Sequence, residues 1–81
     1  MPKQDDYSQK KRMTIRLWKP HDEDRYVMYY QRVHADGEIT FDRVDHDGKG
    51  VTWQYFITVP QVLSTLYAAG QLGYRMQLGE I

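Results

Sequence analysis

Apolar and polar residues alternate along several short segments of this chain, which is the pattern of half-buried β-strands. In MTIRLWK, residues 13–19, one face carries Met13, Ile15 and Leu17, and Trp18 falls on the other face. The segment RYVMYYQRVH, residues 25–34, is rich in β-forming residues and is bounded by turn signals. The sequence therefore predicts a first strand at 13–19 and a second at 25–34.

An Ala-Asp-Gly turn at residues 35–37 follows the second strand and is typical of a β-hairpin. A three-residue loop would pair Val33 with Ile39, whereas a two-residue loop would place Phe41 opposite Arg32. We favour the first register because it keeps the apolar residues of both strands on one face. These residues are Val27, Tyr29, Val33, Ile39 and Phe41.

Two further strands are predicted on either side of a second turn, HDGKG at residues 46–50. The third strand is EITFDRVD, residues 38–45, and the fourth is VTWQYFITV, residues 51–59. Alternate residues of the fourth strand form an apolar stripe, which we expect at the centre of the core. The stripe consists of Val51, Trp53, Tyr55, Ile57 and Val59.

A short helix is predicted after the fourth strand. Thr58 and Gln61 match the capping box S/T-x-x-E/Q, with a proline near the helix start, and Gly70 is a natural stop. Between them, apolar residues recur at helical spacing: Val62, Leu63, Leu66 and Ala69.

A last strand is expected at residues 74–78, with Tyr74, Met76 and Leu78 pointing inward. The element order is then β-β-β-β-α-β. One helix can cover one face of one antiparallel sheet, so the predicted fold is a small two-layer α+β domain. The other face is left for solvent or a partner.

The chain has 81 residues and no cysteine, which is the size of a single small domain without disulfides. No apolar run approaches the roughly 20 residues that cross a bilayer, and the N-terminus lacks the apolar segment of a secretory signal. We therefore expect a soluble, intracellular, cytoplasmic protein without a membrane partner. Residues 1–12 are polar and lack periodicity, which predicts a flexible basic arm followed by one domain at 13–81.

Charge is unevenly distributed although the net charge is zero. Residues 1–19 carry six basic and two acidic groups, a balance of +4, and residues 20–50 carry four basic and eight acidic groups, a balance of −4. The arm is interpreted as a solvated tail, or as a contact for an acidic partner or phosphates.

The stretch around Asp45, Asp47 and Gly48 resembles a calcium-binding loop in composition but not in spacing. With Gly48 placed at the invariant glycine, the first ligand position is Arg43 and the twelfth is Gln54, where carboxylates are required. A turn between two strands explains these residues better. The three histidines, His21, His34 and His46, show no metal-ligand spacing, so neither a metal nor a cofactor is predicted.

No nucleophile–base constellation, phosphate-binding glycine loop or P-loop lysine occurs, so the sequence gives no indication of an enzyme. The segment KGVTWQYF, residues 49–56, matches the RNP1 pattern only in part. Single-stranded nucleic-acid binding is the alternative prediction, with bases stacking on aromatic rings and the arm contacting phosphates. The residues for that role are Lys10, Lys11, Arg12, Arg16, Trp18 and Tyr30.

Protein binding is the preferred prediction. Aromatic residues mixed with charges of both signs are typical of interfaces, and a small sheet leaves edge strands that can pair with a partner or form a homodimer. In size, lack of cysteine and tyrosine-rich strands, the chain resembles the small inhibitor proteins of phages and mobile elements, such as anti-CRISPR proteins or uracil-DNA glycosylase inhibitors. No motif of either group occurs, so the resemblance assigns no residue a role. The predicted contact residues are Trp18, Tyr26, Tyr30, Arg32 and Phe56.

Overall fold

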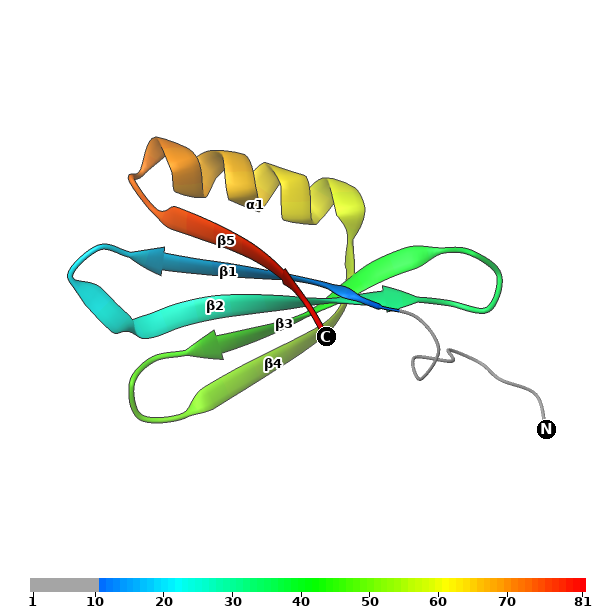
Figure 1. Ribbon diagram of the computed structural model, residues 1–81, viewed down its shortest axis with the longest axis horizontal. Coiled ribbons are helices and arrows are strands. Elements are labelled where there is room, and N and C mark those ends of the chain that lie inside the picture. Colours follow the sequence, from blue (N-terminus) through cyan, green and yellow to red (C-terminus); the bar gives the residue numbers. More distant parts are fainter. Residues whose placement is uncertain (1–10) are drawn as a thin grey trace.

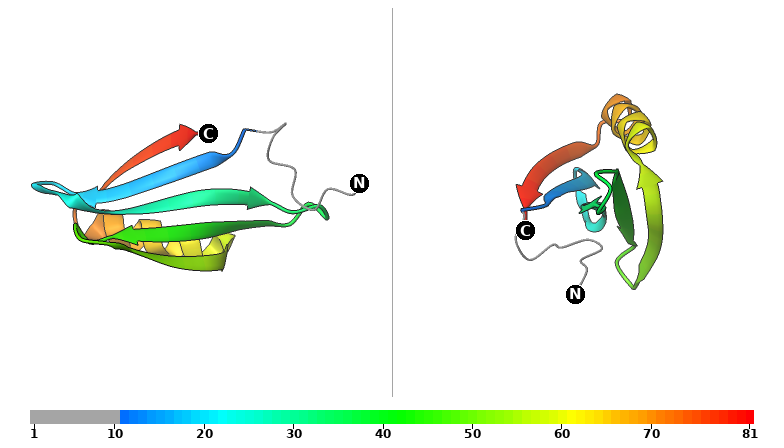
Figure 2. Two further views of the ribbon diagram at one scale, coloured as in Figure 1. Left: turned by 90° about the horizontal axis from the view of Figure 1, so that it is seen from below. Right: turned by 90° about the vertical axis from the view of Figure 1, so that its right-hand side faces the viewer.

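The computed structural model describes residues 11–81, which form one antiparallel sheet and one helix (Figure 1). The strands are β1 (Met13–Lys19), β2 (Asp22–Val33), β3 (Ile39–His46), β4 (Val51–Thr58) and β5 (Arg75–Glu80), and the helix is α1 (Val59–Gln71). Their order across the sheet is β4-β3-β2-β1-β5. The helix lies on one side of the curved sheet (Figure 2), so the predicted β-β-β-β-α-β fold is confirmed.

The β2–β3 hairpin has the predicted three-residue loop. Val33 pairs with Ile39, and the backbone N–H of His34 donates to the carbonyl of Glu38 at 2.9 Å. Gly37 closes the turn at φ +90°, a conformation that glycine adopts without steric cost. On the predicted apolar face of this hairpin, Tyr29 and Phe41 are buried in the core and Val27 packs against it, whereas Ile39 is exposed.

The core lies between the helix and the middle of the sheet. It consists of Ile15, Leu17, Tyr29 and Phe41 from the strands and Val62 and Ala69 from α1. Tyr29 is the largest fully buried side chain, and its ring meets the Phe41 ring edge to face at 6.3 Å. Its hydroxyl accepts a hydrogen bond of 2.9 Å from Arg43, so its polar end is satisfied.

Arg43 is a charged residue on the same side of the sheet as the core. Its guanidinium donates to the carboxylate of Asp45 at 2.6 Å, and this hydrogen bond raises the pKa of Arg43 above its ordinary value against the effect of partial burial. The paired guanidinium therefore stays charged while it holds Tyr29 in place.

The prediction that the β4 stripe forms the centre of the core is wrong. β4 is an edge strand, and Val51, Trp53 and Tyr55 are each about half exposed, at 53%, 48% and 56%. The register also shifts within the strand, because Phe41 pairs with Ile57 whereas Arg43 pairs with Gln54. This β-bulge turns the first half of the stripe away from the helix, and only Ile57 and Val59 pack against the core.

The burial expected for β5 is also wrong, although its apolar residues lie on the predicted side of the sheet. Met76 and Leu78 pair with Leu17 and Ile15 of β1 and so share the helix side of the sheet, yet they are 53% and 61% exposed. α1 packs over β3 and β4, at the opposite edge, and leaves β5 uncovered. β5 is therefore a second open edge with an apolar surface.

The helix begins at the predicted capping box. The Thr58 side chain accepts from the N–H of Gln61, and the Gln61 side chain accepts from the N–H of Thr58 at 2.9 Å. The helix runs past Gly70 and ends at Gln71, and it is Gly73, at φ +85°, that takes the left-handed conformation after it.

The first ten residues of the predicted arm lie outside the described part of the chain. The last of the twelve, Arg12, exchanges backbone hydrogen bonds of 3.2 and 3.0 Å with Ile81. Ordered pairing therefore extends one residue before β1. In the described residues, no helix is long and apolar enough to cross a membrane.

Candidate binding surface

The side of the sheet away from α1 carries a continuous group of aromatic and arginine side chains, here called the open face. Its membership follows from the strand register, because side chains that pair across strands share a side. Its aromatic and charged members, with the residues among them, include Arg16, Trp18, Tyr26, Tyr30, Arg32, Asp42, Val44, His46, Trp53, Tyr55 and Phe56, and Arg75 of β5 lies on the same side opposite Trp18.

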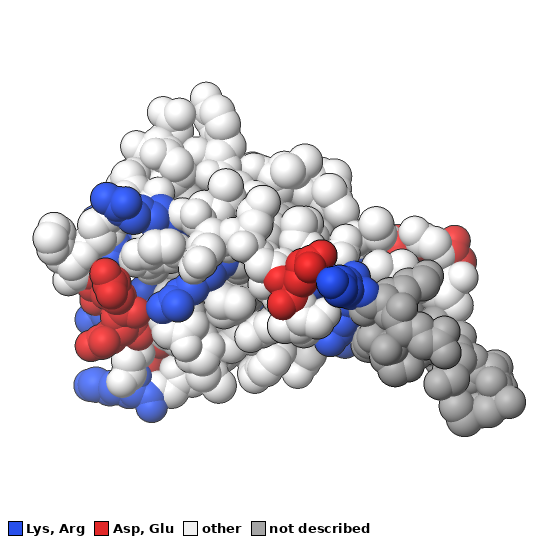
Figure 3. Space-filling view, viewed as in Figure 1, with Lys and Arg blue, Asp and Glu red and all other residues white. Residues whose placement is uncertain are grey.

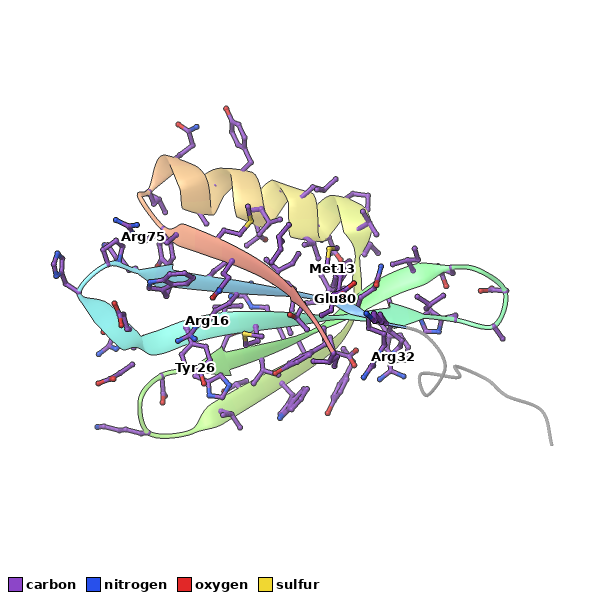
Figure 4. The ribbon with its side chains drawn as sticks, in the orientation of Figure 1. Met13, Arg16, Tyr26, Arg32, Arg75 and Glu80 are labelled. Atoms are coloured by element: carbon purple, nitrogen blue, oxygen red, sulfur yellow. The ribbon has the colours of Figure 1, made fainter. Side chains whose placement is uncertain are left out.

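Arg16 is held between aromatic rings at one end of the open face. Its guanidinium carbon lies 4.4 Å from the ring centre of Tyr26 and 5.4 Å from that of Trp18, and Figure 4 shows Arg16 directed toward Tyr26. Tyr26 in turn stacks on His46 at 4.1 Å. No carboxylate in residues 11–81 pairs with Arg16, so its charge is balanced only by the rings and solvent.

A row of nearly parallel rings crosses the middle of the open face. Trp53 lies 6.3 Å from Tyr30 and 5.9 Å from Tyr55, with interplanar angles of 23° and 10°. Tyr30 comes from β2 and the other two from the edge strand β4. The row reaches the edge of the sheet and exposes large apolar area there.

A third group lies toward the β2–β3 hairpin. Arg32 donates to Asp42 at 2.8 Å, and its guanidinium carbon lies 5.8 Å from the ring centre of Phe56. His34 stacks on the same ring at 6.0 Å and contacts the hydroxyl of Thr40 at 2.8 Å. The Phe56 ring is 64% exposed beyond these contacts.

Phe56 occupies the left-handed region of backbone conformation, at φ +59°, within the β4 bulge. This conformation costs a bulky L-residue roughly 1–2 kcal/mol, and glycine adopts it freely. Phe56→Gly is therefore expected to be more stable than Phe56→Ala by about 1 kcal/mol, the reverse of the usual order in a strand. Urea unfolding of the two variants measures this difference, and an alanine variant as stable as the glycine variant would contradict the strain.

The open face is depleted of carboxylates. Asp42 is the one carboxylate in its middle, and it is paired with Arg32. Other acidic groups of the described chain lie at the ends of the sheet, as at Asp24 in the first residues of β2 and at Asp36 and Asp47 in the turns, or on the helix side, as at Asp45. In the view of Figure 3, charged side chains of both signs gather at one end of the molecule, and a further acidic group beside a basic one lies near its middle.

All five predicted contact residues lie on this surface: Trp18, Tyr26, Tyr30, Arg32 and Phe56. Sequence reasoning placed Trp53 and Tyr55 in the core and so missed them. One signal was available, because the chain contains no charged residue from Gly50 to Tyr74. This stretch supplies far more apolar surface than one short helix and one strand need for a core.

The residues predicted for nucleic-acid contact are only partly brought together. Arg16, Trp18 and Tyr30 lie on the open face. Lys11 forms an exposed ion pair of 3.9 Å with Glu80, and Arg12 continues the ladder beside β5. Lys10 lies outside the described residues.

Residues 47–50 form a turn that the Asp47 side chain closes, and not a calcium-binding loop. Asp47 accepts hydrogen bonds from the N–H groups of Lys49 and Gly50 at 2.8 and 2.9 Å, and these bonds lower the pKa of its carboxyl below the ordinary value. Gly48 adopts φ +92°. Within residues 11–81, no three histidine or carboxylate groups gather as metal ligands would.

Comparison with protein-family models, with curated proteins and with solved structures gives no match for this chain.

Proposed function

We propose that the protein is a non-enzymatic binding module whose open face contacts another protein. The observation that carries this proposal is the strained, two-thirds exposed Phe56 beside a row of half-exposed rings. Backbone strain at an exposed bulky residue is favoured where the ring has a use outside the fold.

The composition of the open face supports a protein partner. Interfaces are enriched in tyrosine, tryptophan, phenylalanine and arginine and depleted of lysine, aspartate and glutamate, and the open face has this make-up. The rings pack against one another and against the Arg16 guanidinium, so little side-chain entropy remains to be lost when a partner binds. A partner would therefore gain rigid aromatic anchors of the kind that dominate binding energy.

An inhibitor of a host protein, of the phage or mobile-element kind, is the form of this function that we propose. A small cysteine-free domain with one preformed contact face needs no cofactor and no catalytic group to block a partner's surface.

The proposal predicts that binding depends on the rings of the open face and not on exposed rings elsewhere. Partners are captured from a lysate of the source cells with the wild-type protein, purified, and titrated calorimetrically against variants. Phe56→Gly and Trp53→Ala are expected to weaken binding at least roughly 30-fold each, because anchor residues contribute 2 kcal/mol or more. Tyr67→Ala, which removes a 73% exposed ring from α1, is the matched control and should bind as the wild type does. Equal binding by all three variants would show that the open face is not the surface that contacts the partner.

A second candidate, single-stranded nucleic-acid binding, is favoured by one specific observation. Arg16 has no carboxylate partner in the described chain and lies against rings on which bases could stack. A fluorescent oligothymidine titrated at several salt concentrations separates the two functions. Binding that falls with salt and is lost in Arg16→Met supports nucleic acid, and absence of binding at low salt leaves the protein partner.

A further inference from the structure

β5 presents an unused row of backbone hydrogen-bonding groups. It pairs with β1 on one side only and forms the edge of the sheet. Arg12 and Ile81 exchange both of their backbone hydrogen bonds, so the alternation of an antiparallel ladder turns the N–H and C=O groups of residues 75, 77 and 79 toward β1. Those of Met76, Leu78 and Glu80 therefore point outward from the sheet.

The surface beside this edge is apolar. Met76 and Leu78 lie on the helix side of β5 and are more than half exposed. On α1, Leu63 is also 59% exposed. Figure 3 shows the region of α1 without charged side chains.

The other edge of the sheet is closed to the same kind of pairing. β4 contains the bulge at Phe56, which interrupts the regular row of backbone groups. A bulge of this kind is a common protection of edge strands against added strands. β5 has an unbroken register over its whole length, so it is the edge that can be extended.

We propose that a second copy of this chain pairs with β5, antiparallel, about a two-fold axis at Gln77. Met76 then lies opposite Leu78 of the second copy and Leu78 opposite its Met76, which joins the apolar surfaces of the two copies on one side of a ten-stranded sheet. Arg75 and Glu80, the two charges of the strand, lie toward its opposite ends (Figure 4). Arg75 pairs with Trp18 and Glu80 with Met13, so the two charges project from opposite sides of the sheet and do not pair across the axis. The antiparallel arrangement keeps the like charges of the two copies at opposite ends of the joined strands.

The two-fold axis can be tested by a cross-link. In the proposed dimer, Gln77 lies opposite Gln77 of the second copy at a non-hydrogen-bonded position, where paired Cα atoms are about 4.5 Å apart. A disulfide spans Cα separations of about 4.4–6.8 Å. The chain has no cysteine, so Gln77→Cys contains a single thiol. We expect this variant to form a covalent dimer rapidly at low concentration. Val51→Cys, on the exposed edge strand β4, is the control, and equal oxidation rates for the two variants would contradict pairing through β5.

The apolar contribution can be tested without a cross-link. Leu78→Lys places a charge beside the axis in both copies, and the residue is already 61% exposed, so the fold should be retained. We expect about a hundredfold weaker self-association, because the change occurs twice per dimer and burying one leucine is worth about tenfold in affinity. Sedimentation at several concentrations measures this, with Val51→Lys as the matched control and circular dichroism as the check of folding. A wild type that stays monomeric at every concentration, or a Leu78→Lys variant that associates equally well, would overturn the proposal.

This dimer forms through the β5 edge and does not use the rings of the open face, so its failure would leave the proposed protein-binding function unaffected. Its success would add to that function, because two copies related by the axis would present two open faces to a partner.

Discussion

Tyr29→Ala is expected to remove a large part of the stability of this protein, from about a quarter to all of it. Replacing a buried aromatic residue with alanine costs about 3–5 kcal/mol, and Tyr29 is 1% exposed at the centre of the core. At about 0.05–0.15 kcal/mol per residue, a domain of this length has a total stability of roughly 4–12 kcal/mol. The variant should therefore lose its cooperative unfolding transition or show a midpoint far below that of the wild type in urea.

Two controls separate the causes of this loss. Tyr29→Phe keeps the ring and removes only the hydroxyl that Arg43 contacts, so it should cost about 1 kcal/mol. Tyr67→Ala removes an equally large ring that is 73% exposed on α1, and its effect should stay within about 0.5 kcal/mol. If the Tyr29 and Tyr67 alanine variants unfolded at similar urea concentrations, the assignment of the core would be wrong.

The parts of the fold that could be predicted are those set by local chemistry. Alternation identifies β1, the Ala-Asp-Gly turn sets the β2–β3 register, and Thr58 with Gln61 starts the helix. Each signal lies within a few residues of the structure it specifies. The element order follows directly from them, and so does the two-layer architecture.

The parts that could not be predicted depend on sheet order. Alternation predicts that the apolar stripe of β4 is buried, because the sequence does not show that β4 is an edge strand with a bulge. The same holds for Met76 and Leu78, whose burial depends on how far α1 reaches across the sheet. Both errors place exposed apolar residues in the core, and both concern the two edges of the sheet.

The candidate surface shows the same division. Trp18, Tyr26 and Tyr30 were assigned to the outer face by simple alternation, and the register of β1 and β2 supports that assignment. Trp53 joins them only because the bulge separates it from Ile57, which alternation places on the same side. A sequence without charge from Gly50 to Tyr74 indicates excess apolar surface, but the strand order decides where that surface lies.

Asp42→Ala is expected to destabilise the protein by about 2 kcal/mol. Asp42 is 9% exposed and its Oδ2 accepts from Arg32 at 2.8 Å, while its Oδ1 is buried without a hydrogen-bond partner in the described chain. Removing one member of a fully buried pair costs about 3–5 kcal/mol, and the smaller value is expected here because the Arg32 side chain remains 27% exposed. Urea unfolding measures the change.

The same substitution distinguishes the two candidate functions, because it removes the one carboxylate from the middle of the open face. Affinity for a single-stranded oligonucleotide should rise at low salt if phosphates bind there, since the face gains one positive charge. A protein partner anchored on Phe56 should instead bind less well, because Asp42 holds the Arg32 guanidinium against that ring.

The double variant Arg32→Met/Asp42→Leu replaces the ion pair with apolar side chains and should recover at least half of the stability that Asp42→Ala loses. If the double variant is no more stable than Asp42→Ala, the loss does not come from breaking the ion pair between Arg32 and Asp42.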